Sequence, residues 1–223
     1  MADNKTKKKI KIKPSDMLFL SVIAYFGTII DSVIYEAIVW TPIIDEIPLG
    51  NFWWTVIYRA LSCIAWGVSI YVIWRVCKKQ GFEMLEAPFE VSKTLWISAT
   101  MTAALMSVFF IIDKGFGTII SAVVTGGVTY LIFLLFSTAM RSMVIVLGQK
   151  WGELCFSKLP KYIPWGGIVF GVCAFVAHLI TKGSLIGALA VMGINIYFGL
   201  VYVFAGRKLA YSIPLTFLML LAM

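Results

Sequence analysis

The sequence predicts an all-α, polytopic membrane protein with about six to eight transmembrane helices in one bundle. Hydrophobic residues make up 61% of the 223 residues and charged residues 13%, whereas soluble domains contain roughly 45–50% and about 25%. Apolar runs of about 18 or more residues recur along the chain, and runs of that length are typical of membrane-crossing helices. A soluble core of this size could not bury so many apolar residues, so we expect one helical membrane domain over residues 16–223.

The positions of the basic residues predict the orientation of the chain. Six lysines lie within the first 13 residues and form a basic cytoplasmic tail, residues 1–15. With the amino terminus in the cytoplasm, 16 of the 19 lysines and arginines fall in the tail or in cytoplasmic segments; the exceptions are Arg59, Lys114 and Lys182. This distribution follows the positive-inside rule. It favours membrane lipid as the partner of the tail and argues against nucleic acid.

The first four apolar runs are expected to form helices. Residues 17–40 follow Pro14-Ser15-Asp16, which is typical of a helix start, and they are long enough to cross a bilayer. Residues 52–76 carry tryptophans near both ends, as helices often do at membrane interfaces. The third span is expected at 94–112 and the fourth from residue 117 or 118 to about 140.

The second half of the chain is less regular. Residues 141–161 are apolar but interrupted by charges such as Arg141, and the sequence leaves open whether they cross the membrane or lie at its surface. Clear spans follow at 164–180 and 184–204, whereas the last 15 residues are short for a full crossing. Gly167 and Gly171 have the spacing that lets two helices approach closely.

Three charged residues fall inside predicted spans, where an ionisable group costs roughly 2.5–3.5 kcal/mol and usually has a partner. Asp31 and Glu36 lie on the first span and Arg59 on the second. An ion pair between Glu36 and Arg59 that locks two helices together is the structural interpretation. A functional carboxylate in a cavity is the alternative, with Asp31 as the better candidate. A small transporter whose pathway these charges line would be a further possibility.

The segments GELCFSK, WGGIVFGVCAFVAHL and YFGLVYVFAGRKLAYSIPLTFLMLL follow one another in the last third of the chain. They resemble the CAAX protease and bacteriocin-processing family of intramembrane proteases, with motifs over 152–223 in a region of about 141–223. That family shows a Glu-Glu-x-x-Phe-Arg segment, a helix ending near a histidine, and a last helix with His-x-x-x-Asn. The resemblance implies the bacterial cytoplasmic membrane as the location.

Carried over position by position, the family motif is incomplete. Glu153 and the single histidine, His178, are kept, and they form a candidate acid–base pair. The other positions are occupied by different residues: Gly152 for the first glutamate, Ser157 for the arginine, Thr216 for the second histidine and Leu220 for the asparagine. Thr216 can donate one hydrogen bond and Leu220 none, and losing one preorganised donor typically costs about 10²–10³ in rate.

The resemblance and its losses together imply a non-catalytic, pseudoprotease-like membrane protein that binds a protein or peptide partner. Self-immunity against a bacteriocin and regulation of a membrane or envelope protein are two versions of this hypothesis. The alternative is a divergent, glutamate-type intramembrane endopeptidase that uses Glu153 and His178. We expect no cofactor and, with one histidine and no cysteine cluster, no metal site. Whether the chain forms an oligomer is left open.

Overall fold

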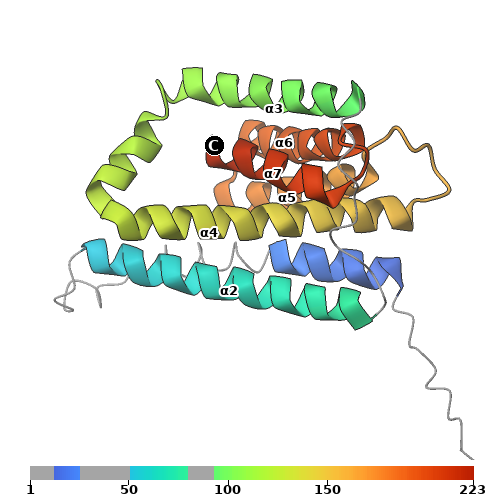
Figure 1. The fold of residues 1–223 in the computed structure, drawn as a ribbon, viewed down its shortest axis with the longest axis horizontal. Coiled ribbons are helices and arrows are strands. Elements are labelled where there is room, and N and C mark those ends of the chain that lie inside the picture. The colour runs from blue at the N-terminus through green and yellow to red at the C-terminus, as the bar shows by residue number, and fades with distance from the viewer. Residues whose placement is uncertain (1–12, 26–50, 80–92) are drawn as a thin grey trace, which may run out of the picture.

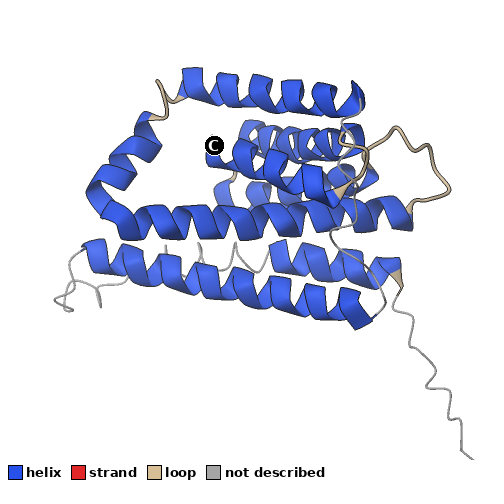
Figure 2. Cartoon of the chain, in the orientation of Figure 1, coloured by secondary structure: helices blue, strands red, loops and turns tan. Residues whose placement is uncertain are grey.

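The computed structural model describes residues 13–25, 51–79 and 93–223, and every regular element in them is a helix (Figure 2). A short helix, Pro14–Tyr25, comes first. It is followed by α2 (Asn51–Lys79), α3 (Lys93–Ile112), α4 (Gly117–Cys155), α5 (Trp165–Lys182), α6 (Leu185–Phe204) and α7 (Leu209–Leu221). Most of these helices run along one common direction, which is horizontal in Figure 1. The all-α fold class is therefore confirmed.

Four of the described helices are long and apolar enough to cross a membrane. They are α3, the part of α4 from Gly127 to Cys155, α5 and α6, with mean hydropathies between 1.5 and 2.0. The helix Pro14–Tyr25 and α7 are also apolar but shorter. Length and composition thus indicate a membrane protein. The expected count of six to eight crossings and the cytoplasmic amino terminus stay predictions.

The helix of the fourth predicted span does not end near residue 140, as the sequence led us to expect. The helix continues from Gly127 to Cys155, so residues 141–155 belong to α4 and the loop begins only after it. Packing explains the continuation: positions 142 and 144–149 are all buried, because α2, α5, α6 and α7 contact α4 from different sides. Arg141, which we expected in a cytoplasmic segment, lies inside this helix.

The real interruption of α4 lies nearer its start. Gly127 has φ 64° and ψ −161°, a backbone conformation that is essentially restricted to glycine. The chain bends there, so the first turns of α4 leave the direction of the rest of the helix (Figure 1). The apolar pattern of the sequence continues through this point, and the adjacent pair Gly126-Gly127 is the one sequence feature that marks the bend.

Glycines bring α4, α5 and α6 unusually close together. A Cβ atom added at Gly152 would collide with the backbone of Gly166 on α5. On the other face of α5, a Cβ atom at Gly167 would lie 3.0 Å from the carbonyl oxygen of Asn195, and one at Gly171 would be equally close to α6. The packing role predicted for Gly167 and Gly171 is therefore confirmed.

Two hydrogen bonds between helices fix α3 against α6. The Ser98 hydroxyl donates to the carbonyl oxygen of Val201 at 3.0 Å, and the Tyr197 hydroxyl donates to that of Met101 at 2.7 Å. Such bonds satisfy polar groups that would otherwise be buried in an apolar environment. They hold α3 although much of its surface is exposed.

Basic residues collect at one end of the bundle, where α2, α4 and α6 end and where α3, α5 and α7 begin (Figure 1). We call this the basic end. Nine of the twelve described basic side chains lie there: Lys13, Arg75, Lys78, Lys93, Lys150, Lys158, Lys161, Arg207 and Lys208. The opposite end carries Asp113, Lys114 and Lys182. The fold thus gathers at one end the basic segments that the sequence assigned to one side of the membrane.

The glycine contact between α4 and α5 gives a first prediction. Gly152→Ala should destabilise the protein by roughly 1–3 kcal/mol, because the new methyl group meets backbone that cannot rotate away. The measurement is the thermal unfolding midpoint of the purified protein in detergent.

Gly193→Ala is the matched control, since a Cβ atom at Gly193 on α6 would meet nothing within 4 Å. That change should be neutral or slightly stabilising. Equal effects of the two substitutions would contradict close packing at Gly152.

Candidate functional site

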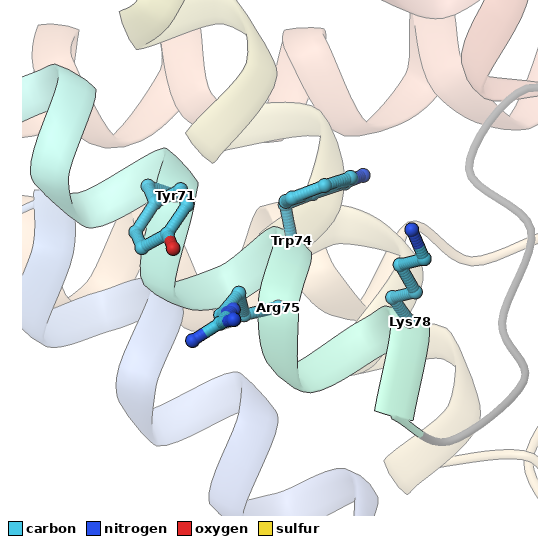
Figure 3. Close-up of a pocket in the computed structure, with 4 residues that line it drawn as sticks. All are labelled: Tyr71, Trp74, Arg75 and Lys78. Atoms are coloured by element: carbon cyan, nitrogen blue, oxygen red, sulfur yellow. The ribbon is translucent and has the colours of Figure 1, made fainter.

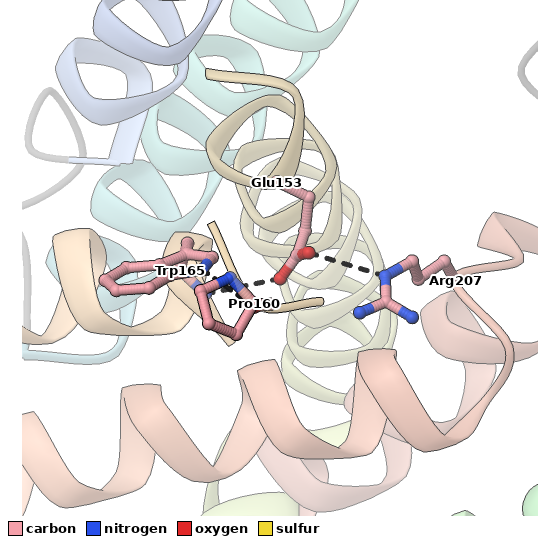
Figure 4. Close-up of polar contacts among 4 residues, drawn as sticks. All are labelled: Glu153, Pro160, Trp165 and Arg207. Atoms are coloured by element: carbon pink, nitrogen blue, oxygen red, sulfur yellow. Dashed lines mark hydrogen bonds and ion pairs between the residues drawn. The ribbon is translucent and has the colours of Figure 1, made fainter. Parts of the chain in front are cut away.

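Glu153 lies near the carboxyl-terminal end of α4 and joins three parts of the chain (Figure 4). Its Oε1 accepts a hydrogen bond from the backbone N–H of Trp165 at 3.2 Å. Its Oε2 is 3.4 Å from Nε of Arg207, with which it forms an ion pair. The Glu153 side chain is 11% exposed and that of Arg207 34%. The carboxylate therefore connects α4 to the start of α5 and to the turn between α6 and α7.

The contact with Trp165 places Glu153 at the amino-terminal end of α5. The first N–H groups of a helix have no partner within the helix, and here the preceding Pro164 has no side chain that could accept from them. The Trp165 N–H donates to the Ile163 carbonyl at 3.0 Å as well as to the Glu153 carboxylate. The carboxylate also faces the positive end of the helix dipole. The indole N–H of Trp165 donates in turn to the Pro160 carbonyl at 3.1 Å, which ties down the connecting loop.

Arg207 is presented by a tight turn at the end of α6. The N–H groups of Gly206 and Arg207 donate to the carbonyls of Val203 and Tyr202, at 3.1 and 3.0 Å, which is the Schellman arrangement at a helix end. Both Gly206 and Arg207 have positive φ, 69° and 60°. For a residue other than glycine this conformation costs roughly 1–2 kcal/mol. The ion pair with Glu153 helps to offset that cost.

The two retained motif residues lie far apart. His178 is 13 residues after Trp165 on α5, which corresponds to about 20 Å along the helix axis. Its imidazole packs against the start of α6, with Nε2 2.6 Å from the position that a Cβ atom of Gly187 would occupy. Because Glu153 is bound at the opposite end of α5, the structure does not bring the candidate acid–base pair together.

The positions where the motif is lost are scattered as well. Gly152 is buried against α5, and Ser157 is exposed in the loop after α4. Thr216 is fully buried in the middle of α7, and Leu220 lies half-buried near the end of that helix. These residues and the retained pair therefore sit at three different levels of the bundle.

For the three charged residues expected inside the membrane, the structure does not give the side-chain positions. Asp31 and Glu36 lie outside the described residues. Arg59 is part of α2, but its side chain is not among those described. The predicted ion pair between Glu36 and Arg59 and the cavity role of Asp31 therefore stay predictions.

Comparisons with models of known protein families, with curated proteins and with solved structures gave no match to this chain. The resemblance to the CAAX protease family therefore rests on the residues quoted above.

Sequence reasoning missed three buried polar side chains, one each on α4, α6 and α7. The side-chain amide of Gln149 on α4, the Asn195 Oδ1 on α6 and the Thr216 hydroxyl on α7 have no hydrogen-bond partner in the described part of the chain. Each residue is at most 2% exposed. Gln149 lies four residues before Glu153 and therefore on the same face of α4. This spacing is the sequence feature from which the burial of Gln149 could have been predicted.

The Glu153–Arg207 ion pair gives a second prediction. Glu153→Gln and Arg207→Gln should show a coupling free energy of roughly 0.5–3 kcal/mol in a double-mutant cycle of unfolding, because the charges are in direct contact and partly shielded from water. Glu153→Ala should cost more than Glu153→Gln, since only glutamine keeps a side-chain acceptor for the Trp165 N–H, which alanine would leave to the Ile163 carbonyl alone. Strictly additive effects would show that the ion pair contributes nothing.

Gln149 gives a third prediction. Gln149→Met keeps the side-chain length but removes an unpaired buried amide, whose desolvation costs about 1–3 kcal/mol, so the variant should unfold at a higher temperature. Gln149→Glu, the control of nearly equal volume, should be strongly destabilising because it buries a charge. A loss of stability in Gln149→Met would mean that the amide has a partner in the folded protein, such as a bound water.

Proposed function

We propose that this protein is a non-catalytic, pseudoprotease-like membrane protein that acts by binding a protein or peptide partner. The proposal places it in the bacterial cytoplasmic membrane with the basic end in the cytoplasm, and it keeps two versions. The protein either protects its own cell against a bacteriocin or regulates a membrane or envelope protein. In both versions the bound partner is affected by association and not by cleavage.

The observation that carries the proposal is the engagement of Glu153. A general base needs access to a water molecule and to the group that it activates. Each carboxylate oxygen of Glu153 instead makes one structural contact, one with the α5 backbone and one with Arg207, and the side chain is only 11% exposed. These contacts stabilise the fold and leave the carboxylate about 20 Å from the level of His178 along α5.

Gly152 supports the same interpretation. The resemblance places a catalytic glutamate at this position, but the backbone of Gly166 occupies the space that any side chain would need. The packing of α4 on α5 and a glutamate at residue 152 therefore exclude one another. A chain that has adopted this close packing has given up that catalytic group.

A pair of substitutions tests the proposal, once a cellular activity such as bacteriocin tolerance can be scored. His178→Ala and Glu153→Gln should each leave that activity within about twofold of the unaltered protein when membrane levels of the variants are equal. The endopeptidase alternative expects both substitutions to abolish it, because removing a general base typically costs about 10²–10⁴ in rate. Quantitative immunoblotting of membranes separates loss of function from loss of protein.

A second measurement addresses cleavage directly. Each candidate partner is co-expressed with the protein and examined by mass spectrometry for new termini. The proposal expects co-purification of the intact partner. A cleaved partner whose cleavage disappears in both variants would overturn it in favour of the endopeptidase.

A further inference from the structure

A shallow pocket lies near the carboxyl-terminal end of α2 (Figure 3). It has a volume of about 420 Å³ and is lined by Tyr71, Trp74, Arg75 and Lys78. These residues follow the spacing of one helix face, with steps of three and four residues. All four side chains are exposed, Tyr71 at 52% and Trp74 at 41%.

This face of α2 points away from the protein core. Ile73 and Cys77, on the other face of the same turns, are completely buried. Helix α2 packs along α4, and both helices end at the basic end (Figure 1). The pocket is therefore on the outside of the bundle, at the basic end.

The two cations of the pocket are positioned by aromatic rings. The Arg75 guanidinium carbon lies 5.6 Å from the centre of the Tyr71 ring, and the Lys78 Nζ lies 5.1 Å from the centre of the Trp74 ring. Such contacts orient a cation without neutralising its charge. No acidic side chain pairs with either cation within the described residues. Among the described side chains, therefore, none neutralises the positive charge of Arg75 or Lys78.

We propose that this pocket binds the phosphate group of an anionic phospholipid. A guanidinium can bind phosphate oxygens in pairs, whereas an ammonium acts as a point charge. Tryptophan and tyrosine beside such cations are characteristic of the level of the lipid headgroups. The face is exposed on the outside of a bundle with apolar helices, where lipid is the neighbouring molecule.

The charges of Arg75 and Lys78 are large enough to favour binding of an anionic lipid. At an exposed site, the carboxyl-terminal end of a helix typically disfavours an anion by about two- to fivefold in affinity. A lysine or arginine near the headgroups favours an anionic lipid by about fivefold each. The two cations together therefore outweigh the helix dipole, and Lys150 adds to the positive potential nearby.

Native mass spectrometry of the full chain in detergent tests the proposal with two probes, dioleoyl phosphatidylglycerol and dioleoyl phosphatidylcholine. The unaltered protein should bind the first phosphatidylglycerol molecule in preference to phosphatidylcholine. Arg75→Gln combined with Lys78→Gln should reduce that preference by roughly 25-fold, about fivefold for each lost cation. An unchanged preference would overturn the proposal.

Two further variants distinguish loss of this site from a general loss of positive charge and from misfolding. Lys158→Gln combined with Lys161→Gln removes two exposed lysines from a loop at the same end and should leave the preference unchanged. Arg75→Lys combined with Lys78→Arg keeps both charges and should retain most of it. An equal loss in the loop variant would mean that lipid binding depends on net charge alone and would overturn the assigned site.

A last arm distinguishes lipid from other anions. Inorganic phosphate, added at the same ionic strength as a chloride control, should not displace phosphatidylglycerol, because the lipid chains also contribute to binding. Displacement by free phosphate would assign the pocket to a soluble anion. If the Arg75 and Lys78 substitutions left lipid preference intact but weakened association with the protein partner, the pocket would belong to that partner instead.

Discussion

The contact between Gly152 on α4 and Gly166 on α5 sets the close spacing of these two helices, on which the contacts of Glu153 depend. It brings the two helix backbones so close that a methyl group does not fit between them. The opposite face of α5 makes a similar approach to α6 through Gly167. Among helices surrounded by lipid, such packing replaces the hydrophobic driving force that is missing there. The ends of α4, α5 and α6 are consequently held together, and the Glu153 carboxylate can reach both the first N–H of α5 and Arg207.

The fold class could be predicted from composition and from the length of the apolar runs, because both reflect the solvent that surrounds the helices. The helix boundaries at 112, 182 and 204 also lie close to charged or glycine-containing turns that are visible in the sequence. The continuation of α4 through Arg141 could not be predicted in this way. It depends on neighbours on several sides of the helix, and those neighbours come from distant parts of the chain.

The candidate site shows the same limit. A lone glutamate in an apolar segment could be singled out from the sequence, and so could the small basic turn that contains Arg207. Their pairing could not, because it joins residues 54 positions apart. The separation of Glu153 from His178, by contrast, could be expected from the sequence, because a helix that begins after Pro164 carries His178 about 21 Å along its axis. The structure has that helix start at Trp165.

The uninterrupted part of α4 has a consequence for the membrane in which it is placed. Its 29 residues correspond to about 43 Å, whereas the hydrocarbon layer of a bilayer is about 30 Å thick. The helix must therefore tilt, thicken the bilayer around it, or extend into the headgroup region. If the hydrocarbon layer begins at Gly127, it ends near residue 147, so that Lys150 and Glu153 lie among the headgroups. Arg141 is then about 9 Å below that boundary, a depth from which a long arginine side chain extends toward the headgroups. The mismatch between the length of this helix and the thickness of the hydrocarbon layer would thus make the protein fit thick membranes better than thin ones.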